Sequence, residues 1–186
     1  MNQIRQMPAK SWDVLRHPRP HVFAAHARHV SDGNMDAPAY LAIAIIIPLV
    51  FSAILYGLID PLGMLRALIQ QMFAFYIFTG VIFFFAQQQG ALGSFAALAY
   101  GFALFYVPIE LLQWLLAMLG ALLPAPWWAG LAIVVVAYLA KAWFAQVAVR
   151  GIMGVRRPGE AWAAVGAGLV TIIILSYALR GGIVGI

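Results

Sequence analysis

The chain has 186 residues, of which 65% are hydrophobic and 9% are charged, and its formal net charge is +5. Soluble globular domains carry roughly 45–50% apolar and 25% charged residues, so this composition excludes an ordinary soluble domain and indicates an integral membrane protein. The sequence contains no cysteine, which excludes disulfides, cysteine zinc sites and thiol catalysis.

The first 38 residues form the only sizeable polar segment of the sequence. Pro18 and Pro20 divide it into two short pieces, in which Ser11 is predicted to cap a helical turn and Pro20 to start a second helix, residues 21–30. Apolar side chains lie among arginines here, which favours short amphipathic pieces on the cytoplasmic leaflet. A partly disordered tail is the alternative.

Five apolar runs follow, each long enough to cross a hydrocarbon core of about 30 Å, which takes about 20 residues. Because lipid cannot satisfy backbone polar groups, spans of this kind are helices. We therefore predict an all-α protein in which residues 39–186 form five transmembrane helices. Short loops join the runs, so the helices are expected to pack as a compact antiparallel bundle. The spans lie at about residues 40–59, 65–86, 94–122, 127–149 and 161–179.

The basic residues divide unevenly between the two ends of these spans. Eight lie before the first span or between the fourth and fifth, and two lie on the opposite side. This asymmetry predicts a cytoplasmic N-terminus and an outside C-terminus, and it explains the positive charge without a nucleic-acid partner. Arginine outnumbers lysine and alanine is abundant, which favours a bacterial cytoplasmic membrane. The arginines expected to face lipid headgroups are Arg16, Arg19, Arg28, Arg150, Arg156 and Arg157.

A small polar cluster interrupts the apolar spans. Glu110 lies inside the third span, where a charge facing lipid costs about 2.5–3.5 kcal/mol on insertion scales. At helical spacing it shares one face with Tyr106 and Gln113. Lys141, one turn after Tyr138, is the other ionisable residue deep in a span. We predict that Glu110 and Lys141 pair inside the bundle, either as a structural lock or as part of an ion, substrate or lipid site.

Metal and catalytic chemistry have little support. The four histidines fall within residues 17–29, and His26 and His29 would be neighbours at i, i+3 on one helix. They are weak metal candidates, because no carboxylate or cysteine completes a ligand set at the required spacing. No phosphate loop, nucleophile elbow or zinc-protease motif occurs in the sequence. We expect no enzyme activity, no metal and no cofactor.

Three stretches resemble the Yip domain family of small five-span membrane proteins. They are HPRPHVFAAHARH, GALGSFAALAYGFALFYVPIELL and YLAKAWFAQVAVRGIMGVRRPGEAWAAVGAGLV. By position, the family motif falls on Tyr100, Gly101 and Pro108. The resemblance implies a non-enzymatic protein with a cytoplasmic N-terminus. The acidic, aromatic and glycine-proline motif of the eukaryotic N-terminal region is absent, so Rab binding is not carried over.

These observations favour a scaffold or accessory subunit that binds other membrane proteins, as part of a larger complex, or membrane lipids. The alternative is a small transporter or lipid or ion carrier that uses Glu110 and Lys141 as its site. The two hypotheses differ in their consequences. A scaffold copurifies with a larger complex, whereas a carrier purifies alone and shows a substrate-dependent or pH-dependent activity.

Overall fold

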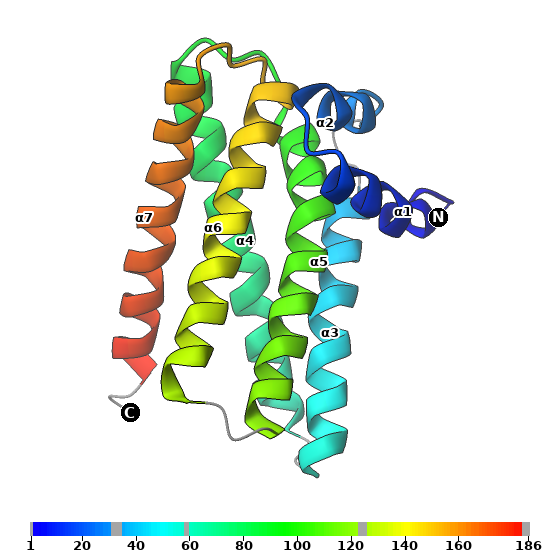
Figure 1. The fold of residues 1–186 in the computed structure, drawn as a ribbon, viewed down its shortest axis with the longest axis vertical. Helices are drawn as coiled ribbons and strands as arrows, with labels where there is room; N and C mark the ends of the chain where they lie inside the picture. Colours follow the sequence, from blue (N-terminus) through cyan, green and yellow to red (C-terminus); the bar gives the residue numbers. More distant parts are fainter. Residues whose placement is uncertain (1, 31–34, 58–59, 123–125, 184–186) are drawn as a thin grey trace.

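The computed structural model describes residues 2–30, 35–57, 60–122 and 126–183. These residues form seven helices and no strand, which confirms the predicted all-α class (Figure 1). The helices are α1 (Asn2–Arg16), α2 (Pro20–Ala27), α3 (Asp36–Tyr56), α4 (Pro61–Gln88), α5 (Phe95–Leu122), α6 (Trp127–Ile152) and α7 (Pro158–Ile183).

The turn between α3 and α4 shows why the helices begin and end where they do. Gly57 follows the last residue of α3 with φ of 65°, a left-handed conformation that glycine adopts without strain. Asp60 caps α4, because its side chain accepts a hydrogen bond of 3.0 Å from the backbone N–H of Gly63. Pro61 occupies the first helical position, where no N–H is needed. Asp60 and Pro61 together define the start of α4.

Four helices are long and apolar enough to cross a membrane. The qualifying stretches are Asp36–Leu55, Pro61–Gln88, Phe95–Gly120 and Trp128–Ile152. Among the described residues, α7 contributes a shorter apolar stretch, Pro158–Ile174. The membrane character predicted from composition therefore rests on four helices, and the fifth span stays a prediction.

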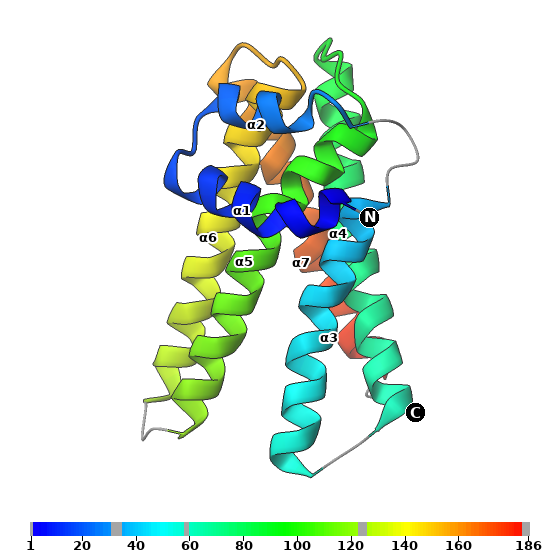
Figure 2. The same ribbon diagram turned by 90° about the vertical axis from the view of Figure 1, so that its right-hand side faces the viewer.

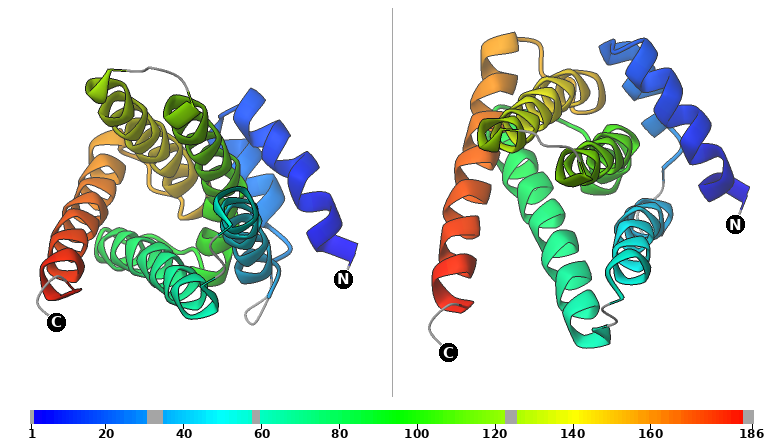
Figure 3. Two further views of the ribbon diagram at one scale, coloured as in Figure 1. Left: turned by 90° about the horizontal axis from the view of Figure 1, so that it is seen from below. Right: turned by 60° about the horizontal axis from the view of Figure 1, so that its bottom comes forward.

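The five long helices form a closed ring. Going round it, α3 packs against α5, α5 against α6, α6 against α7, α7 against α4, and α4 against α3. Figure 3 shows this order in the view from below, and Figure 2 shows α3 and α4 standing opposite the pair of α5 and α6. Helices distant in sequence are thus neighbours, as α4 and α7 are. The ring encloses the part of the bundle in which Glu110 and Lys141 lie.

Small residues and aromatic rings account for the closest helix contacts. A Cβ added at Gly168 of α7 would lie 2.8 Å from Cγ1 of Ile82, so only glycine allows α7 and α4 to approach this closely. Phe105 of α5 is fully buried and stacks on Phe144 of α6, with ring centroids 5.6 Å apart. These contacts set the close packing of α7 on α4 and of α5 on α6.

The helices α1 and α2 pack on the bundle. α1 crosses α5 and α3, while α2 rests on α6 and α5 (Figure 2). The side chains of Val14 and Phe23 are fully buried, whereas Trp12 is 67% exposed. The predicted short pieces are thus helices that bury part of their apolar surface in the bundle, and their placement on the cytoplasmic leaflet stays a prediction. Val14 and Phe23 bury their apolar surface against the ring, where it is removed from water.

Polar contacts and one close backbone approach fasten this segment. Lys10 donates a hydrogen bond of 2.9 Å to the hydroxyl of Tyr100. The hydroxyls of Ser11 and Tyr40 share a hydrogen bond of 3.1 Å. Ser11 lies inside α1 and does not cap a helical turn, so that prediction is wrong. At Gly151 of α6, an added Cβ would lie 2.7 Å from the carbonyl carbon of Pro20. α2 thus begins directly against the backbone of α6.

Candidate functional site

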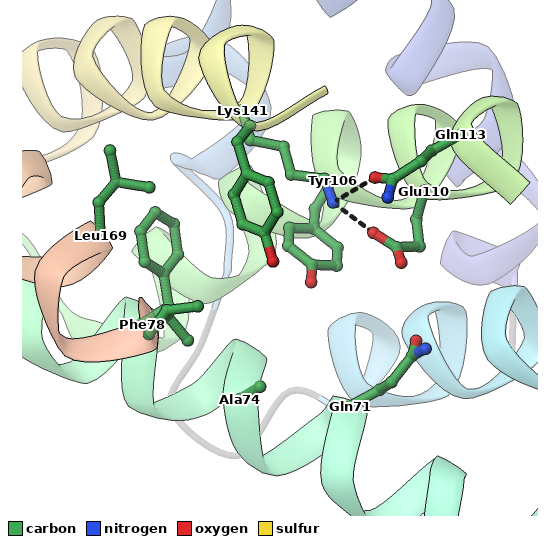
Figure 4. Close-up of a pocket in the computed structure, with 10 residues that line it drawn as sticks. Gln71, Ala74, Phe78, Tyr106, Glu110, Gln113, Lys141 and Leu169 are labelled. Atoms are coloured by element: carbon green, nitrogen blue, oxygen red, sulfur yellow. Dashed lines mark hydrogen bonds and ion pairs between the residues drawn. The ribbon is translucent and has the colours of Figure 1, made fainter. Parts of the chain in front are cut away.

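The polar cluster predicted from the sequence is assembled at the centre of the ring. Lys141 of α6 donates a hydrogen bond and forms an ion pair with Oε2 of Glu110 on α5, as predicted (Figure 4). The Lys141 side chain is 6% exposed and that of Glu110 is 22% exposed. The pair therefore joins α5 and α6 through two opposite charges that are largely buried in the protein.

The remaining contacts of Lys141 come from the same cluster. Its ammonium lies 3.3 Å from Oε1 of Gln113, which accepts a second hydrogen bond. The same nitrogen lies 4.5 Å from the ring centre of Tyr106 and 5.3 Å from that of Tyr138. A desolvated ammonium over aromatic faces gains about 2 kcal/mol or more from the ring quadrupoles. The structure thus brings together all five residues predicted for the intramembrane cluster.

A cavity of about 160 Å³ borders this cluster. Its walls differ in chemistry, as Figure 4 shows, with polar side chains of α5 and α6 on one side. On the other side, α4 contributes Ala74 and Phe78 and α7 contributes Leu169 and Ile172. The ion pair therefore faces a space that is polar on one wall and apolar on the opposite wall.

Sequence reasoning missed one polar residue of this cavity, Gln71 of α4. Its side chain extends toward the α5 wall on which Glu110 lies (Figure 4). The signal in the sequence was the pair Gln70–Gln71 within the apolar run of the second span, because an amide facing lipid is disfavoured. Gln71 matters because it brings a third helix to the polar side of the cavity.

A second concave surface lies between α5 and α6. We call it the α5–α6 groove. It has a volume of about 310 Å³ and a lining of side chains that are apolar except for that of Gln113. It is lined by Ile109, Leu112, Gln113, Leu116, Ala132, Ile133, Val136, Ala137 and Ala140. Gln113 lines both the cavity and the groove, so the two spaces are separated by the residue that also holds Lys141.

The positions assigned to the family motif lie outside the polar cluster. Tyr100 is 1% exposed and accepts the hydrogen bond from Lys10 of α1. Gly101 is buried against Ile152 of α6, whose Cδ1 occupies the space that a Cβ would need. Pro108 lies inside α5, where it cannot donate to the carbonyl of residue 104. Tyr100 and Gly101 therefore belong to the contact with α1 and α6 and not to the polar cluster.

The histidines do not form the pair considered for metal binding. α2 ends at Ala27, so His26 and His29 do not share one helix. His26 instead lies 2.8 Å from Oδ2 of Asp13, and His17 lies 3.3 Å from Oδ1 of the same carboxylate. Among the residues that the structure describes, no group of three or more histidine, aspartate or glutamate side chains is placed to hold a metal ion.

The carboxylate of Asp13 has a shifted acidity. Hydrogen bonds from His26, and then from His17, lower the pKa of Asp13, although its side chain is 47% exposed. A depressed aspartate pKa stabilises the docked segment above the unfolded pKa of about 3.9, and this contribution is lost as pH falls through the folded value. We expect the Asp13 pKa to move back up toward about 3.9 in His26→Ala. Carboxyl NMR titration measures this shift, and an unchanged midpoint contradicts it.

The six arginines predicted to face lipid headgroups occur in α1, around α2, and at and after the end of α6. Five are exposed and Arg150 is half-buried. α2 packs on α6, so these segments share one end of the bundle (Figure 1). Arg157 also lies 3.7 Å from Glu160 in the first turn of α7. The charge asymmetry of the sequence is thus an asymmetry between the two ends of the fold.

Comparisons of the chain with protein-family models, with curated proteins and with solved structures find no match. The resemblance to the Yip domain family therefore stays a prediction based on the sequence.

Proposed function

We propose that the chain is a non-enzymatic integral membrane protein that acts as a scaffold or accessory subunit for other membrane proteins. It would reside in a bacterial cytoplasmic membrane with its N-terminus in the cytoplasm. The observation that carries this proposal is the α5–α6 groove, an apolar concave surface on helices suited to a membrane. The resemblance to the Yip domain family favours the same class of function.

The topology within this proposal has five spans. α7 has 26 residues, and at about 1.5 Å per residue a helix of this length exceeds a hydrocarbon core of about 30 Å. An odd number of spans puts the two termini on opposite sides. The exposed arginines at the α2 end of the bundle favour the cytoplasm for that side.

The groove fits a transmembrane helix of another protein. Three alanines, Ala132, Ala137 and Ala140, lie along its α6 side and allow the backbone of a partner to come close. Gln113 supplies a single amide at the groove, and such an amide strengthens helix association within a membrane. Lipid tails fill an apolar groove less specifically, because they offer no hydrogen-bonding partner for this amide.

Filling the groove tests the proposal. We expect Val136→Trp to abolish copurification of a partner chain in mild detergent, because the larger side chain occupies the space of the partner helix. Leu139→Trp is the matched control, since Leu139 lies on the same helix, is 65% exposed against 64% for Val136, and does not line the groove. A photocrosslinker at position 136 identifies the chain that is in contact.

The scaffold proposal fails if the crosslinker at position 136 captures lipid alone, or if Val136→Trp retains the partner as well as Leu139→Trp does. Thermal unfolding of both variants is measured in parallel. Equal unfolding temperatures show that a lost partner reflects the groove and not a destabilised bundle.

A second candidate function is a small carrier, which the cavity beside Glu110 and Lys141 favours. A buried ion pair next to an open space can exchange a proton or hold a polar ligand. In proteoliposomes, a carrier moves a substrate or protons in a pH-dependent manner, and Glu110→Gln removes this flux at unchanged protein content. A protein that gives no flux in the wild-type form, and whose Glu110→Gln variant changes only stability, is not a carrier.

A further inference from the structure

The cavity beside the ion pair has room for one six-membered ring. Its volume of about 160 Å³ is close to that of engineered protein cavities of about 150 Å³, which accommodate benzene. Phe78 on the apolar wall and Tyr106 on the polar wall supply aromatic surfaces, against which a planar ring stacks or packs edge to face. The dimensions therefore favour a single-ring ligand over a phospholipid headgroup.

The charges of the cavity select an uncharged ligand. Lys141 is paired with Glu110, so the two charges balance and no net charge is offered to a ligand. A charged molecule that entered the space would lose its hydration without gaining a counter-charge, which costs several kcal/mol or more. A neutral molecule avoids this cost.

The polar wall selects a hydrogen-bond donor. Glu110 bonds Lys141 through Oε2, and its side chain remains 22% exposed on the cavity wall. An ionised carboxylate only accepts hydrogen bonds, so its partner in a ligand is a donor such as an O–H group. The side-chain amide of Gln71, on the neighbouring helix, accepts or donates a second bond. Opposite them, Leu169 and Ile172 offer only apolar contact.

We propose that the cavity between α4, α5, α6 and α7 binds a neutral phenol-type ring, with the hydroxyl directed to Glu110 and the ring between Phe78 and Tyr106. The ring could be a free phenol or the headgroup of a quinol that carries an isoprenoid tail, since both present the same hydroxyl. This inference goes beyond the scaffold and gives the carrier candidate a ligand class. The inference requires that the cavity binds this ring, and it does not require that the protein transports it.

The test uses the purified full-length chain in lipid nanodiscs with a diazirine-bearing phenol as the photolabel. We expect the label on peptides that contain Ala74 or Glu110. We expect phenol to compete at least about tenfold better than benzene, because a hydrogen bond to a charged acceptor is lost with benzene. Competition by a prenylated hydroquinone, against competition by phenol alone, distinguishes the two sources of the ring.

Two substitutions on different helices occlude the cavity from its apolar wall and leave the ion pair unchanged. We expect Ala74→Leu and Leu169→Phe each to reduce labelling at least about tenfold, because each side chain occupies the ring position. Ala67→Leu is the control on the same helix, outside the cavity. Two variants on separate helices, each checked by thermal unfolding, separate loss of binding from loss of folding.

Equal labelling in Ala74→Leu and Ala67→Leu overturns the inference. Equal competition by phenol and benzene, or a label confined to the α5–α6 groove, overturns it as well. Specific labelling without any flux in proteoliposomes supports the inference and removes the carrier candidate. Flux of a different substrate without labelling removes the inference and retains the carrier.

Discussion

We expect Lys141→Met to lower the free energy of unfolding by roughly 3–5 kcal/mol, the cost typical of removing one partner from a buried ion pair. The loss is large because the carboxylate of Glu110 is left without its opposite charge and Gln113 loses a donor. The contacts of the ammonium with the rings of Tyr106 and Tyr138 are lost in the same step. Equilibrium unfolding in mixed micelles measures the change.

The double variant Glu110→Gln with Lys141→Met separates charge from packing. Because it removes both charges, we expect it to recover more than half of the loss seen in Lys141→Met. Arg156→Met controls for the removal of a positive charge at an exposed position and should change the free energy by less than about 0.5 kcal/mol. A double variant as unstable as the single variant contradicts a paired-charge origin.

The second large effect is expected at Gly151→Ala. The new Cβ would meet the backbone of Pro20, and a backbone cannot move aside as the end of a side chain does. Overpacking of this kind costs about 1–3 kcal/mol, and here it forces α2 away from α6. We expect a lower unfolding temperature and faster tryptic cleavage after the exposed residues Arg16 and Arg28.

Gly130→Ala is the matched control for this substitution. Gly130 lies on the same helix, and a Cβ added there would meet nothing within 4 Å. Alanine is the better helix former, so we expect no loss of stability and unchanged cleavage. If Gly151→Ala behaves like Gly130→Ala, the close approach of α2 to α6 does not contribute to stability.

The fold class and the ion pair could be predicted because each depends on strong local rules. Long apolar runs form helices wherever water is excluded, and Asp60 before Pro61 specifies a cap and a first helical residue. Glu110 and Lys141 were predictable as partners because two isolated opposite charges in apolar spans have few other ways to be neutralised. The charges of Glu110 and Lys141 thus limit their possible pairing partners before the arrangement of the helices is known.

The docking of the N-terminal helices and the order of the ring could not be predicted in the same way. The hydrogen bond from Lys10 to Tyr100 joins residues far apart in sequence, and nothing near either residue specifies the other. The pairing of α4 with α7 depends on the fit of Ile82 to Gly168. Gln71 was missed because the sequence does not show which of the two adjacent amides, Gln70 or Gln71, faces the bundle interior. Such features arise from shape complementarity between distant segments.

The close contact between α2 and α6 sets a sequence of events during synthesis. Pro20 leaves the ribosome long before Gly151 exists, and Phe23 finds its aromatic neighbour Phe105 only after α5 is made. The helix α2 therefore has no packing surface until α5 and α6 have been produced. We therefore expect α2 to reach its final position after the α5 and α6 helices have been made, although it precedes both of them in the chain.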